Sequence, residues 1–207
     1  MLGNRIDREF VKGNFEYLDV PTVTEGRKER DGSFVYIGRL DAYKGILFLL
    51  DAWIENRKQH LYIFGDGQHK EDVLKTASEN PYIHYMGFQS KETLVKYLSR
   101  ATALIFPSEC LESFGLVIIE AYACGTPVLC TDIGNQAELV RKHQAGSLFA
   151  VGDQESFNRA IADVTENFET MSRNAREAYL IMYTPEANYQ QLEKIYQTVL
   201  QDKDKKL

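Results

Sequence analysis

Residues 103–131, with the sequence ALIFPSECLESFGLVIIEAYACGTPVLCT, contain the pattern that decides the fold. The apolar run 103–106 is typical of a buried strand, and the stretch 114–123, which lacks a polar face, predicts a buried helix. A turn at 125–127 leads into a second apolar strand at 128–131. A strand, a helix and a parallel strand in this order form the unit of a sheet that helices cover on both faces.

The same alternation extends outward in both directions. Short runs of strand-forming residues predict strands at 34–37, 61–64, 83–86 and 146–149. Amphipathic spacing predicts helices at 43–56, 70–78, 91–99 and 136–142, and a helical region from about 153 that breaks at Thr184 and Pro185. We therefore expect an α/β fold with a doubly wound, Rossmann-like parallel sheet in three layers, α/β/α. Ligands of such sheets bind at the carboxyl ends of the strands.

Length and charge set the broad class. The 207 residues suffice for one sizeable α/β domain, which we expect at 33–207, with C-terminal helices from about 153. Residues 1–32 are polar and broken by glycines, so we expect an irregular leader or an interdomain remnant there. The net charge of −6 and the pI of about 5.3 argue against a nucleic-acid-binding protein, which needs a basic face.

The cysteines and the apolar runs indicate the compartment. Cys110, Cys124 and Cys130 are odd in number and lack metal-ligand spacing, so we expect free thiols in a reducing compartment. The first residues lack the apolar core of a signal peptide, and the chain has no run of about 18 apolar residues. We expect a cytoplasmic protein without an integral membrane segment. Peripheral contact with the inner face of a membrane is compatible with this sequence.

Two carboxylates border the helix predicted at 114–123. Glu112 precedes this helix, and Glu120 lies about two helical turns further along it. Free backbone N–H groups at a helix start attract anions, and carboxylates accept hydrogen bonds from hydroxyl groups. A ligand with phosphates at one point and sugar hydroxyls on either side would suit this arrangement.

Two cations follow the first predicted strand. Arg39 leaves that strand at its carboxyl end, and Lys44 lies in the start of the next predicted helix, where a cation opposes the helix dipole unless an anion is near. Arginine supplies a planar fork and lysine a movable charge, so together they can neutralise a diphosphate. Alone, each would be interpreted as a solvated loop residue. Their predicted place on the same sheet edge as Glu112 favours the phosphate interpretation.

The remaining candidates have ordinary interpretations. The segment 65–67 (Gly-Asp-Gly) lacks the third glycine of a dinucleotide-binding fingerprint, so it predicts a tight turn. The histidines are scattered without metal-ligand spacing, and we expect no metal. Cys110 lies near the predicted site, but we interpret it as a small, partly buried residue.

These residues resemble the carboxyl-terminal, donor-binding domain of retaining group 1 glycosyltransferases with the GT-B fold. The resemblance extends from about residue 33 to the end of the chain, and both the order and the spacing of its pieces match. The matching segments are 34–40, 44–45, 65–67, 87–88, 107–108, 112–120, 123–128, 131–134 and Glu138.

The resemblance implies a donor site for a nucleotide diphosphate sugar, with UDP as the expected nucleotide and polysaccharide biosynthesis as the expected setting. Arg39 and Lys44 would bind the diphosphate, Glu112 the sugar hydroxyls and Glu120 the ribose hydroxyls. The implied donor-binding set is Gly38, Arg39, Lys44, Gly87, Phe88, Glu112, Ser113, Phe114, Gly115, Leu116, Val117 and Glu120.

Within this set, backbone and base contacts are implied as well. The N–H groups of Phe114 and Gly115 would lie near the sugar, and those of Leu116 and Val117 would face the phosphates. The segment 87–88 would border the nucleobase.

The chain departs from the family pattern at two places. The family often has a second glycine after Gly134, where this chain has Asn135, so we expect an altered loop with unchanged site residues. The family also has an amino-terminal domain that supplies the acceptor site, and residues 1–32 are too few to form it. We therefore expect this domain to be missing from the chain, and the helix after Pro185, which would pack on it, to be partly uncovered.

The resemblance implies transfer of a sugar with retention of its anomeric configuration, catalysed by Glu112, Arg39 and Lys44 without a cofactor. Negative charge on the departing diphosphate would be stabilised by the two cations and the helix start near Phe114. A covalent role for Glu112, by analogy with retaining glycosidases, is the less favoured interpretation.

Two alternatives of other classes remain. The chain can be a non-catalytic module or subunit that binds a nucleotide sugar and acts with a separate partner; as it stands, we expect binding with little turnover. An epimerase or phosphorylase of related architecture is the third interpretation, although no sequence feature indicates the pyridoxal-binding lysine of a phosphorylase.

Overall fold

The computed structural model describes residues 30–54, 58–112 and 114–204. Its centre is a six-stranded sheet in the order β3-β2-β1-β4-β5-β6, in which every neighbouring pair is parallel. The strands are β1 (Phe34–Ile37), β2 (Leu61–Phe64), β3 (Ile83–Gly87), β4 (Ala103–Phe106), β5 (Val128–Thr131) and β6 (Gly146–Phe149). The doubly wound parallel sheet predicted from the sequence is confirmed. Its strand order reverses between β1 and β4, and the crevice at such a reversal is where these folds bind ligands.

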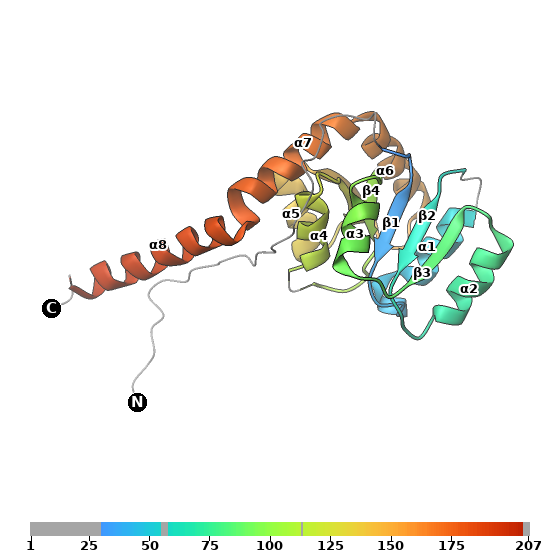
Figure 1. Cartoon of the computed structure of the whole chain (residues 1–207), viewed down its shortest axis with the longest axis horizontal. Helices are drawn as coiled ribbons and strands as arrows, with labels where there is room; N and C mark the ends of the chain where they lie inside the picture. Colours follow the sequence, from blue (N-terminus) through green and yellow to red (C-terminus); the bar gives the residue numbers. More distant parts are fainter. Residues whose placement is uncertain (1–29, 55–57, 113, 205–207) are drawn as a thin grey trace.

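Helices cover both faces of the sheet and extend from one end (Figure 1). They are α1 (Ile46–Ile54), α2 (Lys70–Glu79), α3 (Lys91–Leu98), α4 (Leu116–Ala123), α5 (Gly134–His143), α6 (Gln154–Glu166), α7 (Phe168–Ala178) and α8 (Pro185–Asp204), with a 3₁₀ turn η2 (Ala42–Lys44) and a π-helical turn η3 (Tyr179–Tyr183). Pro185 begins α8 as predicted, and Ser90 caps α3 by accepting from Thr93 N at 3.3 Å. The π-helical turn before Pro185 was not predicted.

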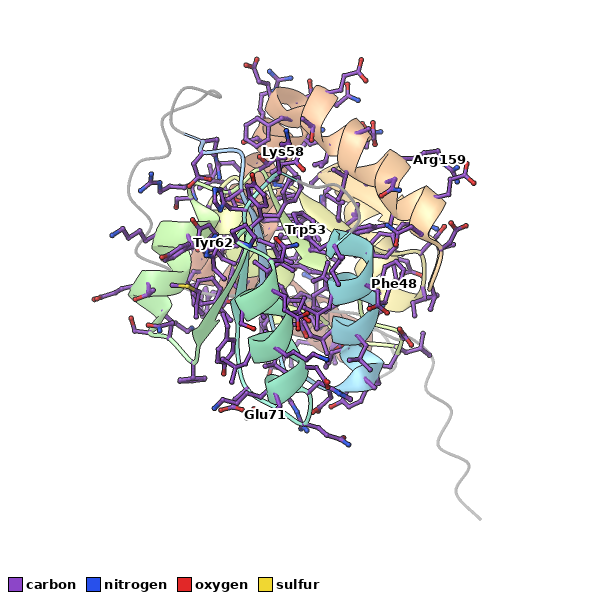
Figure 2. The ribbon with its side chains drawn as sticks, turned by 90° about the vertical axis from the view of Figure 1, so that its right-hand side faces the viewer. Phe48, Trp53, Lys58, Tyr62, Glu71 and Arg159 are labelled. Carbon is purple, nitrogen blue, oxygen red and sulfur yellow. The ribbon has the colours of Figure 1, made fainter. Side chains whose placement is uncertain are left out.

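Alternating strand side chains divide the core into two layers. Phe34 and Tyr36 of β1 face α1, α2 and α6, whereas Val35 faces α3, α4, α5 and α7. In the first layer Trp53 contacts Phe34 edge to face, with ring centroids 5.3 Å apart, and Figure 2 shows Phe48 and Trp53 on α1 next to α6. The helix α4 is buried along most of its length, as its lack of a polar face predicted.

The predicted helix 43–56 is wrong at its start. Lys44 ends a 3₁₀ turn, Gly45 adopts a left-handed conformation with φ of 71°, and α1 begins only at Ile46. The reason is a close approach of two backbones, because a Cβ atom on residue 45 would lie 1.9 Å from the carbonyl oxygen of Pro107. Lys44 is therefore presented from a tight turn against the end of β4 and is not part of the first turn of α1.

Arg30 joins the beginning of the described chain to the end of the sheet opposite the carboxyl edge. Its guanidinium donates to the carbonyl oxygens of Leu98, Ala101, Cys124 and Gly125 and to Thr126 Oγ1, at 2.8–3.0 Å. These carbonyls lie at or just beyond the ends of α3 and α4, where a cation complements the helix dipoles. Burial lowers the pKa of Arg30 to about 10, so the guanidinium remains charged at neutral pH.

The helix α8 projects away from the three layers (Figure 1). Tyr189 and Tyr196 are about two-thirds exposed, at 65% and 62%, which agrees with the expectation that this helix is partly uncovered. None of the helices within the described ranges could cross a membrane, because none is both long and apolar enough.

His60 and His84 form a contact that the sequence did not indicate. Their Nδ1 and Nε2 atoms are 2.7 Å apart, and the His84 ring stacks on Tyr62 with centroids 4.9 Å apart. Burial and the neighbouring His60 lower the pKa of His84 below its ordinary value. Protonation of His84 is therefore easier in the unfolded chain than in the folded one.

We expect this pair to make the protein less stable in mild acid. As the pH falls through about 6.5, the unfolded chain binds more protons at His84 than the folded chain does, so the free energy of unfolding decreases. Urea unfolding at pH 7.5 and 5.5 measures this decrease. It should be smaller in His84→Gln than in the unsubstituted protein, and an equal decrease in both proteins would contradict the assignment.

Candidate functional site

A cleft of about 450 Å³ opens at the carboxyl ends of β1 and β4, where the strand order reverses. Residues from the ends of both strands and from α4 line it: Tyr36, Ile37, Gly38, Arg39, Lys44, Phe106, Pro107, Ser108, Glu112, Phe114, Gly115, Leu116, Val117 and Glu120. The two cations and the two carboxylates predicted from the sequence therefore lie around a single cleft.

The Glu112 carboxylate is held on one side of this cleft by two donors. Lys44 Nζ lies 2.5 Å from Glu112 Oε1, and Ser108 Oγ donates to the same oxygen at 2.7 Å. The side chains of Lys44 and Glu112 are 22% and 15% exposed, so water screens their interaction only in part. The thiol of Cys110 lies further away, 3.7 Å from Glu112 Oε1.

The electrostatics of Glu112 follow from these contacts. Burial acts to raise its pKa, but the hydrogen bonds and the charge of Lys44, with the hydrogen bond from Ser108, bring the pKa below its ordinary value. Glu112 is therefore an anion at neutral pH. An anion can accept hydrogen bonds from hydroxyl groups but cannot serve as a general acid.

Arg39 occupies the rim of the cleft. Its Nη2 pairs with Asp41 Oδ2 at 2.5 Å, while 70% of the side chain remains exposed. Tyr36 lies below and donates its hydroxyl hydrogen to the carbonyl oxygen of Arg39 at 2.6 Å, which fixes the backbone from which the arginine extends. The backbone of Arg39 is thus fixed, whereas most of its side chain is accessible although Nη2 pairs with Asp41.

The opposite wall is the start of α4. The predicted helix 114–123 begins two residues late, at Leu116, because Gly115 is the N-cap in a left-handed conformation with φ of 76°. The first backbone N–H groups of a helix have no partner within the helix, so those of Leu116 and Val117 are suited to an anion. Glu120 follows one turn later and lies 4.0 Å from Lys91 Nζ.

A second cavity of about 250 Å³ adjoins the cleft and shares Ile37, Gly38 and Arg39 with it. Phe88, which is 89% exposed, lines this cavity. Gly87 ends β3 beside it but is not among the residues that line either cavity. The structure thus brings Phe88 next to the cleft and places Gly87, with φ of 66°, as the last residue of β3.

The predicted site residues and those that the structure places around the cleft differ at a few positions. Ser113 lies outside the described residues. Sequence reasoning did not name Ser108 as a site residue, although its position two residues after β4 would have suggested it, and treated Asn135 only as a loop departure. Asn135 Nδ2 in fact donates to the carbonyl oxygen of Glu112 at 3.1 Å. In the described part of the chain, no three side chains of His, Cys, Asp or Glu come together as metal ligands would.

The chain matches the family model described as "Glycosyl transferases group 1" over residues 23–180. It is 31% identical to a glycogen synthase of Mycobacterium tuberculosis over 161 residues, which are 73% of this chain and 39% of that protein. It is 27% identical to the D-rhamnosyltransferase WbpZ of Pseudomonas aeruginosa over 158 residues, covering 73% of this chain and 41% of that one.

Solved structures share the fold. A sucrose-phosphate synthase from Thermosynechococcus elongatus superposes with a TM-score of 0.71 at 26% identity, covering 86% of this chain and 47% of that protein. Anabaena HepE, solved in complex with UDP, has a TM-score of 0.71 at 21% identity, covering 83% and 50%. The chain thus spans half or less of the length of each of these proteins.

Proposed function

We propose that this chain, which belongs to the group 1 glycosyl transferases, binds the sugar-nucleotide donor of a glycosyltransferase. The full-length protein would transfer the sugar from a nucleotide diphosphate to an acceptor with retention of anomeric configuration. The observation that carries this proposal is the cleft that Arg39, Lys44, Glu112, Glu120 and the start of α4 line together.

Donor binding would proceed by an exchange of partners at Lys44. In the structure the Lys44 ammonium pairs with the Glu112 carboxylate at 2.5 Å. A diphosphate carries more negative charge than one carboxylate, so Lys44 would turn toward the phosphates and Arg39 would swing in from the rim. Glu112 would then accept hydrogen bonds from the donor sugar and remain oriented by Ser108 at 2.7 Å.

The same groups would lower the barrier of the chemical step. Negative charge grows on the diphosphate as its bond to the sugar breaks, and Lys44, Arg39 and the N–H groups at the start of α4, which all line the cleft, would stabilise that charge. Glu112 is better suited to binding than to nucleophilic attack, because the hydrogen bond from Ser108 would still occupy its Oε1 after Lys44 turns to the phosphates.

The nucleoside would extend along the carboxyl edge of the sheet. Glu120 would accept hydrogen bonds from the ribose hydroxyls, and the cavity beside Phe88 would receive the base. UDP is the nucleotide to test first, because HepE was solved with it. The free thiols Cys110, Cys124 and Cys130 fit a reducing, cytoplasmic compartment.

An acceptor domain, on the same polypeptide or a separate subunit, would complete the active site. The exposed side chains of α8, including Tyr189, Tyr196 and Val199, would pack against that domain. By itself the chain would bind donor with little or no turnover. Adding a candidate acceptor domain in trans and assaying sugar transfer would separate an incomplete enzyme from a binding subunit that never catalyses.

Calorimetric titration of UDP, GDP and ADP tests the binding site. We expect one nucleotide to bind in the micromolar to millimolar range, and Glu120→Ala to weaken it about tenfold through loss of charged hydrogen bonds of about 1.5 kcal/mol. Arg39→Ala should cost less, about threefold, because its exposed guanidinium is largely screened.

The control for charge is Glu193→Ala, which removes an exposed carboxylate from α8. Its affinity should equal that of the unsubstituted protein. Equal affinities in the unsubstituted protein, Glu120→Ala and Arg39→Ala would overturn the assignment of the site.

A further inference from the structure

The first turn of α5 hydrogen-bonds to the backbone of the segment that carries Glu112. Two side-chain amides donate to two carbonyl oxygens of this segment: Asn135 Nδ2 to Glu112 O at 3.1 Å and Gln136 Nε2 to Cys110 O at 3.2 Å. The donors are adjacent in sequence and the acceptors flank Leu111, so the contacts bracket a three-residue stretch of backbone.

The surrounding packing supports these two hydrogen bonds. Gln136 is fully buried, so water competes little at the donor end of its hydrogen bond to Cys110. Gly134 lies close to the same segment with φ of 58°, and a Cβ atom there would come within 2.9 Å of the Leu111 side chain. The start of α5 therefore lies against Leu111, the residue between the two acceptors.

The direction of these hydrogen bonds separates them from helix capping. A capping side chain accepts hydrogen bonds from the N–H groups of its own helix. Asn135 and Gln136 instead donate, and their acceptors belong to a loop more than 20 residues earlier in the chain, with separations of 23 and 26 residues. The contacts therefore connect the start of α5 to the segment beside the cleft.

From these contacts we infer that Asn135 and Gln136 are positioning residues that hold the Glu112 carboxylate in the cleft through the 110–112 backbone. The inference rests on the proposed function in one respect. If Lys44 leaves Glu112 when the donor binds, two sets of contacts remain to orient the carboxylate toward the sugar. They are the side-chain hydrogen bond from Ser108 and the two hydrogen bonds from α5 to the 110–112 backbone. Neither amide needs to touch the donor.

The test on the protein without ligand is a carbon-13 NMR titration of the Glu112 carboxyl. The variants are Asn135→Ala and Gln136→Met, the second chosen to keep the volume of a buried side chain. When either hydrogen bond from α5 is lost, the Glu112 carboxylate should move away from Lys44 and Ser108, and its pKa should rise toward the ordinary value. Asn174→Ala is the matched control, because Asn174 Nδ2 also donates to a backbone carbonyl, that of Gln144 at 3.0 Å, away from the cleft.

A rise in the Glu112 pKa in both variants, with none in Asn174→Ala, supports the inference. An unchanged Glu112 pKa in folded Asn135→Ala and Gln136→Met overturns it. This measurement requires no nucleotide, so it remains decisive even if the chain binds none and the proposed function fails.

A second measurement compares the affinities for UDP and UDP-glucose in the same variants. We expect affinity for UDP to change less than twofold, whereas the ratio of UDP-glucose affinity to UDP affinity should fall about three- to tenfold, as loss of an oriented hydrogen bond to the sugar implies. A merely structural role would weaken both ligands equally, and that result, or an unchanged ratio, would count against positioning. A ratio of one already in the unsubstituted protein would also reject the sugar-orienting role.

Discussion

Lys44→Met is expected to weaken binding of the nucleoside diphosphate about thirtyfold. Methionine keeps much of the length of lysine but removes its charge, and a charged hydrogen bond to a phosphate contributes about 2 kcal/mol. Lys44 should matter more than Arg39 because its side chain is 22% exposed, compared with 70%, and its charge is less screened. Calorimetric titration of UDP measures the change.

The same substitution should also alter Glu112. Without Lys44 the carboxylate loses both a hydrogen bond and a charge partner, so its pKa should rise, and nucleotide binding should become more dependent on pH in the weakly acidic range. Lys142→Met, at the exposed C-terminal turn of α5, makes the same change in net charge and should bind UDP normally. Equal weakening by both substitutions would indicate a general effect of net charge and would contradict a specific phosphate contact.

Gly45→Ala is expected to destabilise the fold by about 3–4 kcal/mol. The left-handed conformation at φ of 71° costs a Cβ-bearing residue about 1–2 kcal/mol, and the methyl group would overlap the Pro107 carbonyl oxygen at 1.9 Å, which requires backbone displacement. Since domains of this kind are stable by about 5–15 kcal/mol, the loss should appear as a large fall in the urea midpoint.

Gly152→Ala is the matched control. Residue 152 has a similar φ of 70°, but a Cβ atom there would have no neighbour within 4 Å. It should therefore show the conformational cost alone, about 1–2 kcal/mol. If the two alanine variants lost the same stability, the contact between the turn at 45 and the end of β4 would not be the cause.

The sheet could be predicted because its signals are local. Each strand is a short apolar run bounded by turns, and β1 and β4 appear at the predicted residues. Helix starts were less accurate: α1 begins at Ile46 and α4 at Leu116, later than their hydrophobic periodicity indicates. In both cases a glycine in a left-handed conformation delays the helix, and that conformation depends on what lies beside it in space.

Part of the candidate site could also be predicted from the sequence. The carboxyl ends of parallel strands meet at one edge, so the presence of Arg39, Lys44, Glu112 and Glu120 at one cleft followed from the order of the elements. Phe88 beside a second cavity agrees with the same principle.

The sequence by itself thus determined the sheet, the edge at which ligands would bind and the charged side chains gathered there, because periodicity and element order are properties of the chain. Only the tertiary structure decided that Lys44 pairs with Glu112 across 68 residues and that Asn135 reaches the Glu112 carbonyl across 23. Such contacts depend on turn conformations and on interatomic distances of about 3 Å, which no local pattern encodes.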